Sequence, residues 1–127
     1  MPSVFITGAS SDIGLAVANR YLENGYRLFG HYRTNNPTLQ ALAEHNENVH
    51  LAKGDFSTPE DLEDFISENC DHIQACDVLI NVASGFFAGG FQDLNAETFF
   101  AAIKTNAWPT FRLIQDLAPH MQSRRWG

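Results

Sequence analysis

The stretch Val4-Phe5-Ile6-Thr7-Gly8-Ala9-Ser10-Ser11-Asp12-Ile13-Gly14 decides the fold of this 127-residue chain. Val4 to Ile6 form a short apolar run typical of a buried strand, and a helical pattern begins near Gly14. Gly8 allows a tight turn that a side chain forbids, and Gly14 lets the first helical turn lie close to the strand. This order predicts an anion site, because the backbone N–H groups and the positive end of the helix dipole point at a ligand there.

A dinucleotide pyrophosphate is the anion that such a site suits, but Asp12 stands where the usual pattern has a middle glycine. A carboxylate pointing inward would repel the pyrophosphate, whereas one turned back onto the helix would cap it. We expect the second arrangement, and therefore weakened rather than abolished cofactor binding. The alternative is that Asp12 or Ser11 only caps an ordinary helix.

The composition fits a single α/β domain. A chain of this length buries about two-thirds of its unfolded surface, so it can form a core. Fifteen acidic residues outnumber eight Lys and Arg, and the net charge of −7 argues against a nucleic-acid or anionic-membrane partner. The two cysteines predict free thiols in a reducing compartment, and we expect no metal site. With no leader and no apolar run of membrane-spanning length, we expect a cytoplasmic protein.

Short apolar runs alternate with amphipathic segments, which predicts an open, doubly wound parallel sheet with right-handed crossovers. We expect strands at 3–7, 26–31, 49–52 and 77–82 in the order 3-2-1-4, with the loop 8–14 at the carboxyl edge. Asn36-Pro37 and Thr58-Pro59-Glu60-Asp61 mark two helix starts. Asn95 is expected to cap a long helix over 96–122 that bends or breaks near Pro109.

In this order the motifs resemble those of the short-chain dehydrogenases/reductases, over the whole chain. Thr7-Gly8 with Gly14 resembles that family's cofactor loop, and Asp55 resembles its adenine-contacting acid. Asn81-Val82-Ala83-Ser84 resembles its Asn-Asn-Ala-Gly element, with Val82 and Ser84 as departures. The resemblance implies a Rossmann-like dinucleotide-binding domain over 1–127. The cofactor-binding residues that it implies are Thr7, Gly8, Ser10, Ser11, Asp12, Ile13, Gly14, Tyr32, Arg33, Asp55, Phe56, Asn81 and Ala83.

The end of the second strand bears on the choice of cofactor. An acid there accepts hydrogen bonds from the ribose 2′-OH, whereas an arginine favours a 2′-phosphate through charge-assisted bonds. In the family's register Tyr32 takes the position of the acid, and Arg33 follows where NADP-preferring members carry a basic residue. We therefore expect NADP rather than NAD, the alternative being that Arg33 is a solvated surface residue.

The activity that the resemblance implies is hydride transfer between NADP(H) and a small carbonyl or alcohol substrate. Of the family's catalytic residues, Asn106 is present in these 127 residues, while the serine and the Tyr-x-x-x-Lys segment are absent. We expect a sheet truncated after the fourth strand and the following long helix, and a chain that is catalytically incompetent alone. It is then part of a longer enzyme, or a truncated relative that binds a nucleotide or a partner without catalysis.

An open sheet edge at the fourth strand and a bare apolar face on the long helix would favour self-association. That face comprises Phe99, Ile103, Phe111, Ile114 and Leu117. The loop 84–91 carries three phenylalanines, which we expect to pack against the long helix. The alternative for this loop is contact with an apolar substrate or another subunit.

A phosphorelay receiver domain is the rival interpretation from another class. Receivers are acidic, doubly wound domains of this length, and Asp55, Ser84 and Lys104 are suggestively placed. They also need two acids after the first strand to hold Mg²⁺, where this chain has Thr7-Gly8-Ala9. We therefore favour the dehydrogenase interpretation.

Overall fold

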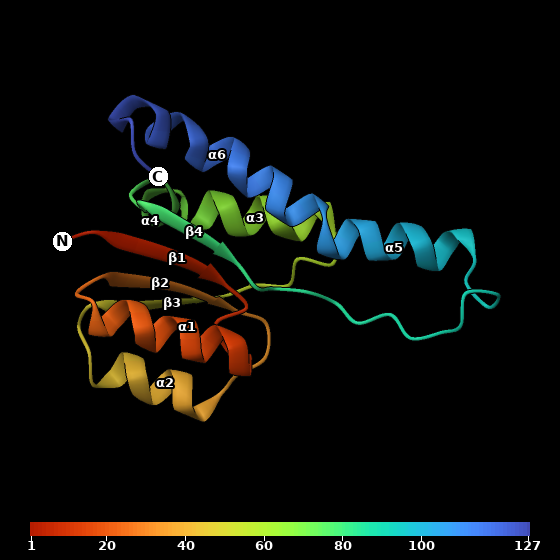
Figure 1. The fold of residues 1–127 in the computed structure, drawn as a ribbon, viewed down its shortest axis with the longest axis horizontal. Helices are drawn as coiled ribbons and strands as arrows, with labels where there is room; N and C mark the ends of the chain where they lie inside the picture. Colours follow the sequence, from red (N-terminus) through yellow and green to blue (C-terminus); the bar gives the residue numbers. More distant parts are fainter.

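A computed structural model describes all 127 residues as a parallel sheet with helices on both faces (Figure 1). The strands are β1 (Ser3–Thr7), β2 (Arg27–Tyr32), β3 (Val49–Lys53) and β4 (Val78–Asn81). They are hydrogen-bonded in the order β3-β2-β1-β4, and every pair is parallel. The α/β class, the strand order and the open edge at β4 are therefore confirmed.

Helices cover the two faces of the sheet in separate groups (Figure 1). On one face lie α1 (Asp12–Glu23) and α2 (Pro37–Glu44). On the other lie α3 (Pro59–Glu68), α4 (Cys70–Gln74) and α6 (Trp108–Arg124), while α5 (Ala96–Asn106) projects beyond the sheet. No helix combines the length and the apolar character that crossing a membrane requires.

The central strand β1 contributes to both hydrophobic layers, because successive side chains of a strand point to opposite faces. Phe5 packs with Phe29 and Phe65 in the layer under α3 and α6. Val4 and Ile6 belong to the layer under α1 and α2. All three β1 side chains are fully buried, as expected for a parallel sheet covered on both faces.

Most element boundaries agree with the sequence prediction to within a residue or two. β2 begins and ends one residue later than expected, and the long helix divides at Ala107, two residues before Pro109, as predicted. The short helix α4 was not predicted, because five residues give no detectable helical periodicity. On the long helix Leu117 is buried rather than bare, whereas Phe99 and Phe111 are more than half exposed.

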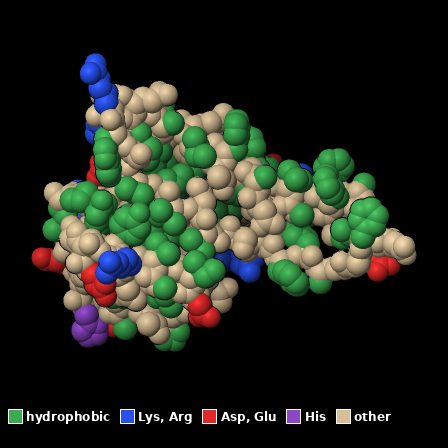
Figure 2. Space-filling view, in the orientation of Figure 1, with side chains coloured by type: hydrophobic (Ala, Val, Ile, Leu, Met, Phe, Trp, Pro, Cys, Tyr) green, Lys and Arg blue, Asp and Glu red, His purple; other side chains and the backbone are tan.

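Two of the three phenylalanines of loop 84–91 do not pack against the long helix, so the expectation was wrong for Phe86 and Phe91. These two side chains are 93% and 94% exposed, whereas Phe87 is only 37% exposed. The loop runs away from the sheet beside the projecting α5, where no second layer exists to bury its side chains (Figure 1). Figure 2 shows hydrophobic side chains along this projecting part.

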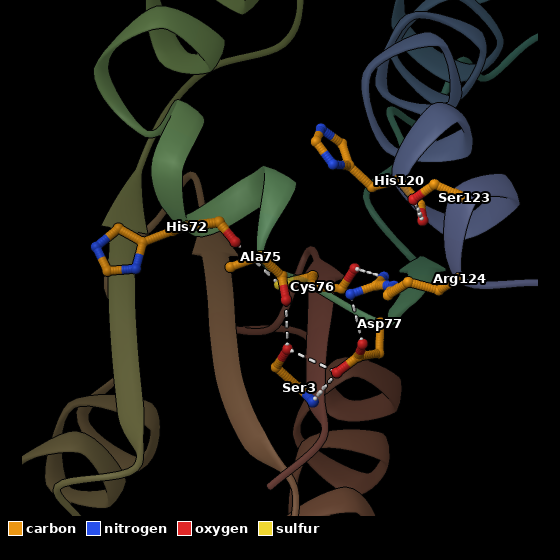
Figure 3. Close-up of polar contacts among 8 residues, drawn as sticks. All are labelled: Ser3, His72, Ala75, Cys76, Asp77, His120, Ser123 and Arg124. Atoms are coloured by element: carbon orange, nitrogen blue, oxygen red, sulfur yellow. Dashed lines mark hydrogen bonds and ion pairs between the residues drawn. The ribbon is translucent and has the colours of Figure 1, made fainter. Parts of the chain in front are cut away.

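A polar cluster fastens the end of α6 to the amino ends of β1 and β4 (Figure 3). One carboxylate oxygen of Asp77 accepts from the Ser3 amide at 2.8 Å, and the other pairs with Arg124 at 2.8 Å. Ser3 Oγ donates to the Ala75 carbonyl at 2.9 Å, and Arg124 donates to the Cys76 carbonyl at 3.1 Å. Asp77 therefore joins three elements that are distant in sequence.

Replacing Asp77 by alanine should lower the free energy of unfolding by about 2 kcal/mol or more, because hydrogen bonds to a charged group are lost at a site only 20% exposed. Urea denaturation measures this change. The control is Glu23→Ala, which removes a pair with Arg20 whose side chains are 67% and 78% exposed and should change stability by less than about 0.5 kcal/mol. Equal small losses in both variants would show that the cluster does not stabilise the fold.

Candidate functional site

Three backbone segments meet at the carboxyl edge of the sheet with no side chain between them. Gly8 has a φ of +70°, and a Cβ on it would lie 2.7 Å from the Ala83 nitrogen. A Cβ on Gly14 would lie 2.8 Å from Ala9 Cα and overlap the Gly8 carbonyl oxygen. Real Cβ atoms do not approach backbone so closely, so β1, α1 and the segment after β4 can meet only through these glycines.

Ser11 caps α1 through its hydroxyl. Ser11 Oγ accepts from the Gly14 amide at 3.0 Å and donates to the Gly8 carbonyl at 2.9 Å. Asp12 is the first helical residue and is exposed to solvent, so the expectation that its carboxylate caps the helix was wrong. The physical reason is that Ser11 takes the extended N-cap conformation, and a hydroxyl can both accept and donate there.

Thr7 joins the end of β1 to the segment after β4. Its hydroxyl oxygen accepts from the amides of Val82 and Ala83, both at 3.2 Å, and its side chain is buried. These two hydrogen bonds therefore hold Ala83 beside Gly8. Asn81 is the exposed last residue of β4.

His31, which the sequence did not single out, lies buried at the centre of this edge. Its Nδ1 accepts from the Gly8 amide at 3.1 Å, and its Nε2 lies 2.8 Å from the Gly54 carbonyl oxygen. The ring stacks on Phe56 with centroids 3.9 Å apart. Burial lowers the pKa of His31 to about 4, so the ring is neutral near pH 7, and the two partners place its hydrogen on Nε2.

An open pocket of about 220 Å³ lies at this edge and collects residues from all four strand ends. Seven of the predicted cofactor-binding residues line it: Gly8, Ser10, Ser11, Arg33, Asp55, Phe56 and Ala83. Six other lining residues were not predicted: His31, Thr34, Ser57, Val82, Ser84 and Thr105. Most of them adjoin a predicted residue in sequence, which is the signal that could have found them.

The remaining predicted residues lie outside the pocket lining. Gly14 is buried behind the loop, while Ile13 is 67% exposed on α1. Tyr32 is half-buried at the end of β2 and packs with the hydrophobic layer under α1 and α2. The lining at this strand end therefore comes from the neighbours of Tyr32, namely His31, Arg33 and Thr34.

Two charged residues of opposite sign stand on the pocket wall. Arg33 is exposed and forms no ion pair. Asp55 Oδ1 accepts from the Ser57 amide at 2.9 Å, and hydrogen bonding to Ser57, with a smaller effect of nearby Arg33, lowers the pKa of Asp55. The site therefore offers both a free guanidinium and a carboxylate that stays ionised.

Asn106 ends α5 and holds the loop that follows β4. Its Oδ1 accepts from the Gly85 amide at 2.7 Å, and its Nδ2 donates to the Gly85 carbonyl at 3.1 Å. Both polar atoms of the side chain are thus engaged with backbone. The geometry makes Asn106 a positioning residue for this loop, and a direct catalytic role stays a prediction.

Comparison with known proteins identifies relatives over the whole chain. The family model described as short chain dehydrogenase matches residues 2–127. The chain is 35% identical to the 11-beta-hydroxysteroid dehydrogenase-like 3 of Arabidopsis thaliana over 98% of its residues, and 27% identical to the D-beta-hydroxybutyrate dehydrogenase of Rhizobium meliloti over 96%. These matches cover 36% and 49% of the two relatives, so the chain spans half or less of their length.

A solved structure supports the same assignment. The short-chain dehydrogenase from Sphingobium yanoikuyae, determined in complex with NADPH, superposes on all of this chain with a TM-score of 0.81 at 30% identity, and the match covers 51% of that protein. The receiver interpretation fails, because Lys104 lies within α5 and Thr7-Gly8-Ala9, rather than two acids, stands at the end of β1. The chain belongs to the short-chain dehydrogenase/reductase family.

Proposed function

We propose that residues 1–127 form the dinucleotide-binding part of a short-chain dehydrogenase/reductase and bind NADP in preference to NAD. Membership of the family implies a nicotinamide dinucleotide cofactor. The observation that carries the proposal is the cradle of bare backbone that Gly8 and Gly14 form at the amino end of α1, where a Cβ on either glycine would collide with neighbouring backbone. A pyrophosphate suits this helix end, because helix N-termini offer unpaired amides and a positive dipole end.

We assign a part of the cofactor to each group of lining residues. Ser10 and Ser11 with the α1 amino end would hold the pyrophosphate, and Asp55 with Phe56 would contact the adenine. Arg33 would bind the 2′-phosphate of NADP, since its exposed guanidinium has no other ion partner. Asp12 adds a negative charge near the same helix end and would weaken, not prevent, binding.

The cofactor, when bound, supplies or accepts a hydride, and in the whole enzyme the substrate would be a small carbonyl or alcohol. This chain's residues bind and orient it. Thr7 and Asn106 fix the segment after β4 at two points, Ala83 and Gly85, and so hold the part of the pocket wall that Ala83 lines. Asn106 would serve the reaction by holding this wall in place.

We also propose self-association through the edge of β4 and the exposed faces of α5 and α6. Phe99, Phe100 and Ile103 of α5 and Phe111 of α6 are each 48% to 60% exposed. An apolar hollow of about 340 Å³ lies between β4 and α6, lined among others by Leu79 and Ile114. Exposed apolar patches beside an unpaired strand edge are typical of contact surfaces.

Adding a methyl group at Gly14 should abolish dinucleotide binding. In Gly14→Ala the new Cβ would overlap the Gly8 carbonyl and displace the loop from α1, at a cost of about 1–3 kcal/mol in stability. Calorimetric titration with NADPH should show one saturable site in the unaltered chain and none in a folded Gly14→Ala variant. Gly90→Ala is the control, since its Cβ would meet only the Asp93 carboxylate at 3.1 Å. Undiminished binding by Gly14→Ala would refute the proposed cradle.

Cofactor preference should depend on Arg33. Arg33→Ala is expected to weaken NADP binding by roughly 1.5–3 kcal/mol, the range for hydrogen bonds to a charged group, and to leave NAD binding almost unchanged. Parallel titrations with both cofactors measure the difference. Arg125→Ala is a matched control, because that arginine lies at the far end of α6 from the pocket. Equal losses for NADP and NAD would show that Arg33 does not contact the 2′-phosphate.

The 127 residues alone should show no turnover. None of the three tyrosines is followed by a lysine four residues on, so the chain lacks the proton donor of the family. Activity should appear only when the serine and the Tyr-x-x-x-Lys segment are supplied, in the same chain or separately. Steady NADPH oxidation with a carbonyl substrate by the pure chain, lost in Asn106→Ala, would contradict this prediction.

A further inference from the structure

We propose that His31 is a positioning residue for the cofactor loop: its neutral imidazole holds the Gly8 amide and thereby preorganises residues 8–11 for the pyrophosphate. This inference rests on the proposed dinucleotide site and deepens it. His31 does not act on the reacting atoms; it fixes the backbone that would bind the cofactor.

His31 holds the turn through both its side chain and its backbone. Its Nδ1 accepts from the Gly8 amide at 3.1 Å, and its own carbonyl accepts from the Ala9 amide at 2.8 Å. Two successive residues of the turn are thus tied to the end of β2. Glycine has the largest conformational freedom of any residue, and these bonds remove it at the residue with φ of +70°.

The Nε2 side of the ring also has a hydrogen-bond partner. Nε2 donates to the Gly54 carbonyl at 2.8 Å, so the imidazole bridges the turn after β1 and the end of β3. Phe56 stacks on one face, and Phe65 meets the ring edge-on with centroids 5.2 Å apart. Because Gly54 offers only an acceptor and Gly8 only a donor, the neutral ring with hydrogen on Nε2 is the one form that satisfies both partners.

Protonation of His31 at Nδ1 would place a second N–H group opposite the Gly8 N–H, and the hydrogen bond between Gly8 and His31 would break. Burial has the largest effect on the ring and, together with the nearby Arg33, disfavours protonation. These effects outweigh the hydrogen bond to Gly54 and the charge of Asp55, which favour protonation, and the pKa of His31 falls from 6.5 to about 4. The unfolded chain therefore binds this proton at a higher pH than the folded chain. The stabilisation contributed by neutral His31 is complete above pH 6.5 and is lost as the pH falls toward 4.

Two substitutions test separately the two hydrogen bonds that the imidazole ring forms. In His31→Asn an amide oxygen can occupy the place of Nδ1, the same number of bonds from the backbone, and accept from Gly8. In His31→Gln the amide nitrogen can occupy the place of Nε2 and donate to Gly54, while Gly8 loses its acceptor. Both variants carry a neutral amide and lose the imidazole stack on Phe56. They differ by one methylene group, and this difference in reach determines which partner keeps its hydrogen bond.

The test measures Gly8 amide hydrogen exchange by NMR in the free chain and NADPH affinity by fluorescence titration. We expect His31→Gln to accelerate Gly8 exchange and weaken NADPH binding by roughly three- to tenfold relative to His31→Asn, the range for one neutral hydrogen bond. Nitrogen-15 NMR of histidine should show Nδ1 unprotonated in the unaltered chain from pH 7 down to about pH 5.

Equal exchange and equal affinity in the two variants would overturn the positioning role, as would a protonated Nδ1 near pH 7. The exchange measurement needs no cofactor, so it separates two failures. If the unaltered chain does not bind NADPH, the proposed function fails. If Gly8 exchange is the same in both variants while NADPH binds normally, the proposal for His31 fails alone.

Discussion

Three backbone segments approach one another closely at Gly8, and this contact sets the geometry of the pocket. A side chain on Gly8 would meet Ala83, and one on Gly14 would meet the turn itself, so the distance between β1, α1 and the segment after β4 is set by two missing Cβ atoms. Thr7 and Ser11 then lock this arrangement with hydroxyl hydrogen bonds. The pocket forms because these three segments are in backbone contact and still leave the amino end of α1 open.

Uncharged polar groups hold the site, and the guanidinium of Arg33 remains free for a ligand. Four side chains around the pocket form hydrogen bonds with backbone groups: His31, Thr7, Ser11 and Asn106. Arg33 keeps an exposed guanidinium in a chain with a net charge of −7. A positive group on an otherwise acidic protein gives the pocket local attraction for an anion, and this attraction weakens with salt.

The sequence predicted the architecture well, because it depends on local patterns. Apolar runs such as Val4–Ile6 and start signals such as Thr58-Pro59 identify elements without knowledge of their partners. The errors concern tertiary context. Which of Ser11 and Asp12 caps α1 depends on backbone conformation, and the exposure of Phe86 depends on a loop that leaves the sheet.

His31 shows most clearly why part of the site could not be predicted. In the sequence His31 is one polar residue in a buried strand, and no neighbouring motif indicates its hydrogen-bond partners. These partners, Gly8 and Gly54, are each 23 residues away along the chain, in opposite directions. The predicted lining residues came instead from motif positions, and seven of them do lie together. Motifs therefore located the pocket, whereas the supporting contacts required the fold.

Chemical-shift mapping of the chain with NADP is the most direct test of the proposed cofactor site. Nitrogen-15 NMR spectra recorded during titration follow the backbone amides, so they locate the ligand without assuming a site. We expect the largest shifts at Gly8 to Gly14, with Arg33, Asp55 and Ala83 also affected, and saturation at one equivalent. Shifts confined to the opposite end of the sheet, near Arg27, His50 and His72, or no saturable shifts from a folded chain, would contradict it.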